Sequence, residues 1–253
     1  MWITSVLIAL VFAAGGLYVL HKVRAIHRQI YALEDRLETL VTRDMPKAWR
    51  QIEAVLHLQR ELGLVPGLSP TREWIASPDL LIELARHVRR AKPKRVVECG
   101  SGASTVVIAR ALQQNGAGHI YSLDHDPTFA EITRQRLIEA GLSDYATVIT
   151  APLREQNFGA HRSAWYNIPI LPDGPYDLVV IDGPPEIGGT QARYPAGPTL
   201  VSRLAPGGVV FVDDTVRTDE QEIAARWIQE NAGLTLEDRP WFDKGLMIIR
   251  KAA

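Results

Sequence analysis

The sequence predicts an α/β domain with a mainly parallel sheet, preceded by a membrane-spanning helix and a helical stalk. Two observations lead to this prediction. From about residue 71 onward, short apolar runs typical of strands alternate with amphipathic stretches typical of helices. Before this region, an apolar run at the N-terminus is followed by apolar residues at steps of three and four. We therefore expect four parts: an anchor over residues 1–21, a stalk over 22–62, a linker over 63–76 and the folded domain over 77–253.

Composition excludes several protein classes. The 253 residues include 28 Lys and Arg against 29 Asp and Glu, so the formal net charge is -1 and the whole chain has no basic field to hold nucleic acid. We therefore expect no nucleic-acid partner. With 46% hydrophobic and 23% charged residues, the chain is neither fully disordered nor collagen-like. Cys99 is the single cysteine, which excludes an internal disulfide and a zinc site built from several cysteines.

The N-terminal run from Trp2 to Leu20 is long enough to cross a bilayer as a helix, because a helix rises about 1.5 Å per residue and the hydrocarbon layer is about 30 Å thick. A cleavable signal peptide is the alternative, but such a peptide carries its positive charges before the apolar run. Here the basic residues follow the run: Lys22, Arg24 and Arg28. Because basic flanks stay in the cytoplasm, the sequence predicts a single-pass protein of the inner (plasma) membrane with a cytoplasmic domain.

The predicted stalk carries a seam of apolar residues, from Val23 to Leu40, at alternating steps of three and four. This spacing places them along one side of a helix and is typical of coiled coils. One interpretation is a parallel homodimer joined through the stalk, and the other is an amphipathic helix that folds back on its own domain. Glycines and prolines between residues 63 and 70 then break the helix.

Within the domain, helices are predicted from apolar residues on one face and strands from short apolar runs. Gly116 and Gly141 end two of the helices. The expected helices are Pro78–Arg90, Ser104–Gln114, Pro127–Ala140, Pro198–Leu204 and Thr218–Asn231. The expected strands are Arg95–Glu98, His119–Leu123, Ala146–Thr150, Asp177–Ile181, Val209–Val212, Leu234–Asp238 and Leu246–Arg250. The stretch from Leu153 to Pro175 has no regular period, so we expect an irregular loop there.

A glycine turn follows the first strand of the domain. The strand ends in Glu98, the turn contains Gly100 and Gly102, and a helix begins directly afterwards. Glycines allow a ligand to approach the backbone, and the helix N-terminus offers free N–H groups. A dinucleotide fingerprint would place a third glycine at position 105, where this chain has threonine, so an NAD-linked dehydrogenase is disfavoured.

Two carboxylates near this turn indicate the kind of ligand. Glu98 would repel a pyrophosphate but suits a ligand that carries an amino group. Asp124 ends the second strand, where an ionised carboxylate can accept hydrogen bonds from both hydroxyls of a ribose. We therefore expect a nucleoside without phosphates.

Three further carboxylates follow the next two central strands. Asp182 ends one strand, and Asp213 and Asp214 end the other, so all three should converge at the ligand crevice of a parallel sheet. A hard divalent cation would relieve their mutual repulsion, and Mg²⁺ fits an all-oxygen site better than Zn²⁺ does. The alternatives are local roles: a helix cap for Asp213, an ion pair with Arg217 for Asp214 and a turn at Gly183 for Asp182.

These residues resemble the class I S-adenosylmethionine (SAM)-dependent methyltransferases, from about Ser77 to Arg250. Glu98, Gly100 and Gly102 match the first motif of that family, and Asp124 matches its ribose-binding acidic position. The resemblance implies a Rossmann-like, seven-stranded, mainly parallel sheet with a reversed last strand, and SAM as the cofactor. The residues expected to bind the cofactor are Glu98, Gly100, Ser101, Gly102, Ser104, Asp124, His125 and Asp182.

The three aspartates resemble the metal site of the catechol O-methyltransferase-like branch and of related bacterial sugar O-methyltransferases. The resemblance implies Mg²⁺, or another divalent cation, bound by Asp182, Asp213 and Asp214, with Asp182 and Asp213 as catalytic residues. The sugar-methylating relatives carry an acidic residue at the position that is Pro184 here, so the general base cannot be transferred. Three residues stay open for that role: Glu186, His161 and Tyr194.

The expected reaction is O-methylation of a hydroxyl on a glycan or lipid-linked sugar at the membrane. Aromatic rings stack well on sugar faces, so Trp165 is a candidate for acceptor binding, with packing on the sheet as the alternative. A different class of function is a catalytically inactive, cofactor-binding scaffold that recruits partners through the stalk. The intact aspartates argue against it.

Overall fold

The computed structural model describes residues 2–63, 76–159, 161–168, 171–186 and 190–253. The chain divides into two compact units, residues 1–50 and residues 51–253. Most of the predicted linker, residues 64–75, lies outside the described residues. The division into anchor, stalk, linker and domain stays a prediction.

The N-terminal unit is helical. It contains α1 (Trp2–Thr39), a short π-helical segment (Leu40–Asp44) and the first residues of α2 (Met45–Leu62). Among the described residues of α1, none is buried, although many are large and apolar. By length and composition the helical stretch can cross a membrane, a test that signal sequences also pass. An uncovered apolar surface of this extent is unusual on a water-soluble monomer.

The second unit contains a seven-stranded sheet with the order β3-β2-β1-β6-β7-β9-β8. β9 is antiparallel to both of its neighbours, and the pairs from β3 to β7 are parallel. The predicted Rossmann-like sheet with a reversed last strand is therefore confirmed. Its strands are β1 (Arg95–Cys99), β2 (His119–Asp124), β3 (Ala146–Thr150), β6 (Tyr176–Ile181), β7 (Leu204–Asp213), β8 (Leu234–Arg239) and β9 (Leu246–Lys251).

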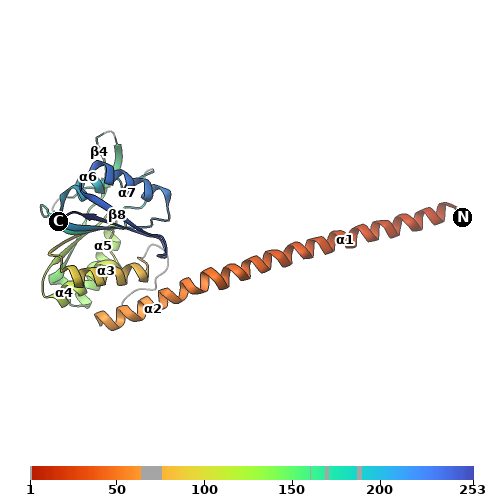
Figure 1. The fold of residues 1–253 in the computed structure, drawn as a ribbon, viewed down its shortest axis with the longest axis horizontal. Coiled ribbons are helices and arrows are strands. Elements are labelled where there is room, and N and C mark those ends of the chain that lie inside the picture. The colour runs from red at the N-terminus through yellow and green to blue at the C-terminus, as the bar shows by residue number, and fades with distance from the viewer. Residues whose placement is uncertain (1, 64–75, 160, 169–170, 187–189) are drawn as a thin grey trace. The chain divides into compact units, whose positions relative to one another are not determined.

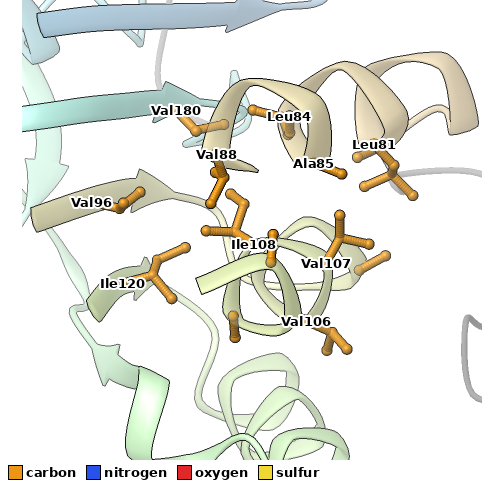
Figure 2. Packing of buried hydrophobic residues seen from close by; sticks show 14 of the residues in the cluster. Leu81, Leu84, Ala85, Val88, Val96, Val106, Val107, Ile108, Ile120 and Val180 are labelled. Carbon is orange, nitrogen blue, oxygen red and sulfur yellow. The ribbon is translucent and has the colours of Figure 1, made fainter. Parts of the chain in front are cut away.

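Helices cover both faces of the sheet (Figure 1). One face carries α3 (Pro78–Ala91), α4 (Ala103–Asn115) and α5 (Pro127–Glu139), and the other carries α6 (Ala196–Thr199) and α7 (Thr218–Glu230). Successive strand residues point to opposite faces, so the neighbours Val96 and Val97 of β1 enter different core clusters. Figure 2 shows Val88 of α3 next to Ile108 of α4 within the first cluster.

The end of α2 belongs to this unit. Ala54 and Leu58 are buried in the first core cluster. Gln51 exchanges two hydrogen bonds with Asp79 of α3: its side-chain amide donates at 3.0 Å, and the Asp79 backbone N–H donates to it at 3.2 Å. Glu61 lies 3.1 Å from Arg89. Residues 51–62 of the predicted stalk therefore pack against the domain.

A hairpin occupies residues 153–166, the larger part of the stretch from Leu153 to Pro175 in which we expected an irregular loop. β4 (Leu153–Phe158) and β5 (His161–Tyr166) pair antiparallel in a two-stranded sheet of their own. The expectation was wrong because β4 is mostly polar and lacks the apolar alternation from which strands are recognised. Pairing with β5 and burial of Trp165 and Tyr166 in the second core cluster define the strand instead.

The region before β7 also differs from the expectation. The expected helix Pro198–Leu204 is divided between α6 and a 3₁₀ turn at Val201–Arg203, and β7 begins at Leu204 instead of Val209. Prolines and glycines in this stretch shorten the helix, and strand pairing extends β7.

Candidate functional site

The glycine turn joins the ends of three strands. The backbone N–H of Gly100 donates to Leu123 O at the end of β2 at 2.8 Å, and the N–H of Asp182 donates to Cys99 O at 3.0 Å. Gly100 has a φ of +97°, and a Cβ at this position would lie 3.0 Å from Asp182 O. Glycine is therefore required at position 100 for two reasons: its backbone is left-handed, and the next strand end approaches closely.

Glu98 lies beneath this turn and is completely buried. One of its carboxylate oxygens accepts hydrogen bonds from the hydroxyls of Thr105 and Ser122, and the Thr105 oxygen in turn accepts from the Gly102 N–H at 2.9 Å. Burial raises the pKa of Glu98 from its usual 4.5 to about 7, although hydrogen bonds from nearby hydroxyls oppose the shift. Glu98 thus ties the glycine turn to α4. Glu98 is not among the residues that line the cavity described next. A direct contact with the amino group of a ligand would require Glu98 to reach that cavity.

A cavity of about 330 Å³ opens beside the turn. We call it the donor cavity. It is lined by Gly100, Ser101, Asp124, His125, Asp126, Phe129, Tyr166, Asp182, Gly183 and Pro185. Five of the eight residues that we expected to bind a cofactor are in this set, and Glu98, Gly102 and Ser104 are outside it.

Asp124 is fixed at the wall of the donor cavity. One carboxylate oxygen accepts from the backbone N–H of Ser101 at 3.1 Å and from its hydroxyl, and the other accepts from the N–H of Asp126 at 3.0 Å. These bonds orient the carboxylate and leave further lone pairs for a ligand. Sequence reasoning missed Phe129 and Tyr166 as lining residues. A signal for Phe129 is its position in the first turn of α5, three residues after the Asp126 cap.

The three aspartates converge as the parallel topology requires. Asp182, Asp213 and Asp214 each offer one carboxylate oxygen within 4.8 Å of the others. Both carboxylate oxygens of Asp213 are buried and have no hydrogen-bond partner among the described residues. Burial, together with the charges of Asp182 and Asp214, holds the pKa of Asp213 well above its usual range. Burial likewise raises the pKa of Asp182 to about 6, against the opposing effect of Arg193.

The donor set fits a hard divalent cation. Buried, unpartnered carboxylate oxygens are costly on their own, and a cation with oxygen ligands would satisfy them. Asp182, Asp213 and Asp214 would hold such a cation. The ion pair between Asp214 and Arg217, one of the local alternatives, is also present at 3.4 Å.

Arg193 lies among the aspartates, and the sequence pattern assigned it no role at the site. Its buried guanidinium lies 2.7 Å from Asp214, 3.9 Å from Asp182 and 3.6 Å from Glu220. It also donates to the backbone oxygen of Asp213 at 3.1 Å. Arg193 therefore compensates part of the negative charge of these carboxylates. Its partners lie 11 to 27 positions away along the chain, so a local sequence pattern does not reveal the contacts.

A second cavity, of about 460 Å³, adjoins the aspartates. We call it the acceptor cavity. It is lined by Asp182, Pro185, Arg193, Asp214, Val216, Arg217, Asp243 and Lys244. Asp182 and Pro185 line both cavities, so the two spaces meet at the end of β6.

The three candidates for a general base are not among the described residues that line either cavity. The Tyr194 hydroxyl lies 3.0 Å from a Glu230 carboxylate oxygen and accepts from Arg226 at 2.8 Å. The ring of His161 packs against Tyr194, with 4.5 Å between ring centroids. Glu186 lies 3.7 Å from Arg217. Arg217 also lies 3.4 Å from Asp214, so Glu186 shares an ion-pair partner with one of the three aspartates.

Comparison with known proteins gives the same class as the fold and the site. A family described as a methyltransferase domain matches residues 97–215. The chain is 31% identical over 178 residues to a catechol O-methyltransferase from Mycobacterium tuberculosis, and the matched region covers 62% of this chain and 72% of that relative. It is 23% identical over 212 residues to a ribosomal protein L11 methyltransferase from Chloroflexus aurantiacus, covering 74% of this chain and 63% of that relative.

Solved structures agree in fold. An SAH-bound methyltransferase from Podospora anserina matches with a TM-score of 0.58 and 18% identity, covering 84% of this chain and 96% of that one. An O-methyltransferase of tomaymycin synthesis from Streptomyces achromogenes, in complex with SAM, matches with a TM-score of 0.53 and 18% identity, covering 80% of this chain and 89% of that one.

The fold, the glycine turn and the adjoining carboxylates define a class I SAM-dependent methyltransferase. Within this class, the chain belongs to the O-methyltransferase branch that includes the catechol O-methyltransferases. It is therefore an enzyme that binds SAM and methylates oxygen.

Proposed function

We propose that this enzyme methylates a hydroxyl group of a glycan or lipid-linked sugar at the membrane, with a divalent cation at the three aspartates. The observation that carries the proposal is the meeting of the donor and acceptor cavities at Asp182, beside the unpartnered carboxylate of Asp213. A methyl donor in one cavity and a hydroxyl in the other would face each other at this point.

The residues of the donor cavity are suited to a nucleoside. Asp124 would accept hydrogen bonds from the ribose hydroxyls, and Ser101 and Asp126 hold its carboxylate for this purpose. Gly100 leaves the strand end uncovered, so a ligand can lie against the backbone. SAM supplies an electrophilic methyl group on sulfur, which moves to the acceptor oxygen as the C–S bond breaks and the O–C bond forms.

The residues of the acceptor cavity would orient the hydroxyl. Asp182, Asp213 and Asp214 would hold the cation, with Arg193 keeping Asp214 in place at 2.7 Å. A divalent cation at these aspartates would supply Lewis-acid chemistry, which favours loss of the proton from an acceptor hydroxyl. The proton released on methylation would pass to solvent.

The acceptor is argued from the surroundings of the site. Trp165 does not support sugar stacking, because it is 1% exposed and packed in the second core cluster. The polar and charged lining of the acceptor cavity favours a hydroxyl-rich, polar acceptor. The exposed apolar helix α1 would keep the enzyme at the bilayer, where lipid-linked sugars reside.

For the anchor, we propose a single pass through the inner membrane with the domain in the cytoplasm. The apolar surface of α1 and the basic residues after Leu20 support it. The exposed seam from Val23 to Leu40 supports a homodimer through α1. A topology reporter fused after Ala253 should give a cytoplasmic signal, and a periplasmic signal would contradict this orientation.

The acceptor is tested by incubating the full-length protein, in detergent, with labelled SAM and a membrane extract from a strain that lacks it. We expect label in the glycolipid fraction, dependent on Mg²⁺, and none with Asp213→Asn. Mass spectrometry of envelope glycans should show a methyl group that the deletion strain lacks. Label confined to protein or to small aromatic compounds would contradict the sugar acceptor.

A further inference from the structure

The last residue of the hairpin, Tyr166, lines the donor cavity. The hairpin holds it firmly, because the side-chain amide of Gln156 donates to the backbone oxygens of Trp165 and Tyr166 at 3.2 and 3.3 Å. The Asn167 N–H donates to Pro152 O at 3.0 Å and closes the base of the hairpin. The ring of Tyr166 also packs edge-on against Trp165. The position of this side chain is therefore set before any ligand binds.

The hydroxyl of Tyr166 has no hydrogen-bond partner among the described residues, and the side chain is only 2% exposed. It lies close above the turn after β6, since a Cβ on Gly183 would be 2.6 Å from the hydroxyl oxygen. The absence of a side chain at Gly183 thus leaves room for the phenol. A buried hydroxyl without a partner is costly, and such groups in native proteins call for an explanation.

The surroundings of the hydroxyl narrow its chemistry. Burial, followed by the nearby Cys99 and Asp124, holds the pKa of Tyr166 well above its usual range, so the phenol stays protonated. It can therefore donate a hydrogen bond and does not serve as the base that removes the acceptor proton. Its cavity neighbours include Asp124 at the nucleoside end and Asp182 at the end shared with the acceptor cavity.

We propose that the Tyr166 hydroxyl is a donor-binding group, which hydrogen-bonds bound SAM between the part held by Asp124 and the reacting end beside Asp182. This inference rests on the proposed use of the donor cavity. Because the hydroxyl gives up no hydrogen bond with a described residue, the new hydrogen bond is not offset by one that is lost. The hairpin, which is separate from the seven-stranded sheet, thus contributes to donor binding through one side chain.

The test compares Tyr166→Phe with Tyr176→Phe in the full-length protein. Tyr176 is also completely buried in the second core cluster, but its hydroxyl donates to Pro172 O at 2.8 Å and it is not among the residues that line the donor cavity. Calorimetry with S-adenosylhomocysteine (SAH) measures donor-site affinity without turnover. A thermal unfolding scan without ligand measures the structural effect of each change.

We expect Tyr166→Phe to weaken SAH binding roughly 10-fold and to leave the unfolding midpoint unchanged or raised, because an unpartnered buried hydroxyl is removed. Tyr176→Phe should lower the midpoint and keep the wild-type affinity. Wild-type affinity in Tyr166→Phe would overturn the inference. So would a fall in its midpoint like that of Tyr176→Phe, which would show a structural role. A wild-type protein that does not bind SAH would instead contradict the use of the donor cavity itself.

Discussion

The donor and acceptor cavities share Asp182 but satisfy their carboxylates in opposite ways. In the donor cavity, both oxygens of Asp124 accept hydrogen bonds from neighbouring backbone N–H groups. Beside the acceptor cavity, the two carboxylate oxygens of Asp213 are buried without a well-formed hydrogen bond from the described residues, and Asp214 is paired with the guanidinium of Arg193. The carboxylate of the donor cavity is therefore hydrogen-bonded without a ligand, whereas the carboxylates beside the acceptor cavity repel one another, and a cation can relieve this repulsion. Four substitutions test this contrast.

The largest effect is expected from Arg193→Met. Removing one partner of a buried ion pair typically costs about 3–5 kcal/mol, because the remaining charges are left uncompensated. The free energy of unfolding, measured with urea on the full-length protein, should fall by about this amount. In Arg193→Lys the free energy of unfolding should fall by less. Added Mg²⁺ should restore part of the loss.

The control is Arg162→Met, which removes an arginine that is 72% exposed and paired with Glu155 on the hairpin. This variant should unfold almost like the wild type, since exposed ion pairs contribute little. If Arg193→Met were as stable as the control, the folded protein would not depend on the guanidinium of Arg193 to compensate the charge of the aspartates.

Asp213→Asn should abolish most turnover and leave donor binding intact. We expect at least about a 100-fold loss in rate, because a catalytic metal contributes several kcal/mol of charge stabilisation. The SAH affinity should stay within about twofold of the wild type, as Asp213 is not among the residues that line the donor cavity. The matched control is Asp144→Asn, on an exposed turn that lines neither cavity, and it should keep wild-type turnover. Undiminished turnover in Asp213→Asn, or in wild type after chelation, would refute the metal role.

Glu98→Gln should remove a pH dependence of stability. The pKa of Glu98 is raised by burial from 4.5 to about 7, so the folded state binds its proton more tightly than the unfolded state does. Its contribution to stability is therefore greatest below about pH 4.5 and is lost as the pH rises to about 7.

Relative to wild type, Glu98→Gln should gain stability between pH 5 and pH 8, by an amount on the order of 3 kcal/mol. Urea unfolding at several pH values measures this difference. A difference that is constant with pH would mean that Glu98 is ionised in the fold and that the turn is held by a charged group.

The smallest effect is expected from Asp124→Asn. An amide in place of the carboxylate weakens acceptance from ribose hydroxyls, so SAH affinity should fall about tenfold in calorimetry. Turnover at saturating SAM should change little, because the aspartates of the acceptor side are intact. Wild-type affinity for SAH in this variant would contradict the proposed contact between Asp124 and the ribose. Equal losses of SAH affinity and of turnover at saturating SAM would contradict the separate roles of the donor and acceptor cavities.

The sequence alone identifies the parts of the site that follow directly from strand ends. Gly100 directly follows β1 and Asp124 is the last residue of β2, and the parallel order of β2, β1, β6 and β7 places such positions at one edge of the sheet. For the same reason the three aspartates could be expected to converge. These conclusions need only the apolar periodicity and the direction of the chain.

The tertiary structure alone decides the groups that act across the chain. Arg193 meets Asp182, Asp214 and Glu220 only after folding, and Tyr166 approaches Gly183 only because the polar hairpin is paired and packed. Glu98 shows the limit most directly: its position in the motif can be read from the sequence, but its hydrogen bonds from the hydroxyls of Thr105 and Ser122 exist only in the folded chain. Hydrogen bonds and ion pairs depend on distances between atoms, and a linear pattern does not contain these distances.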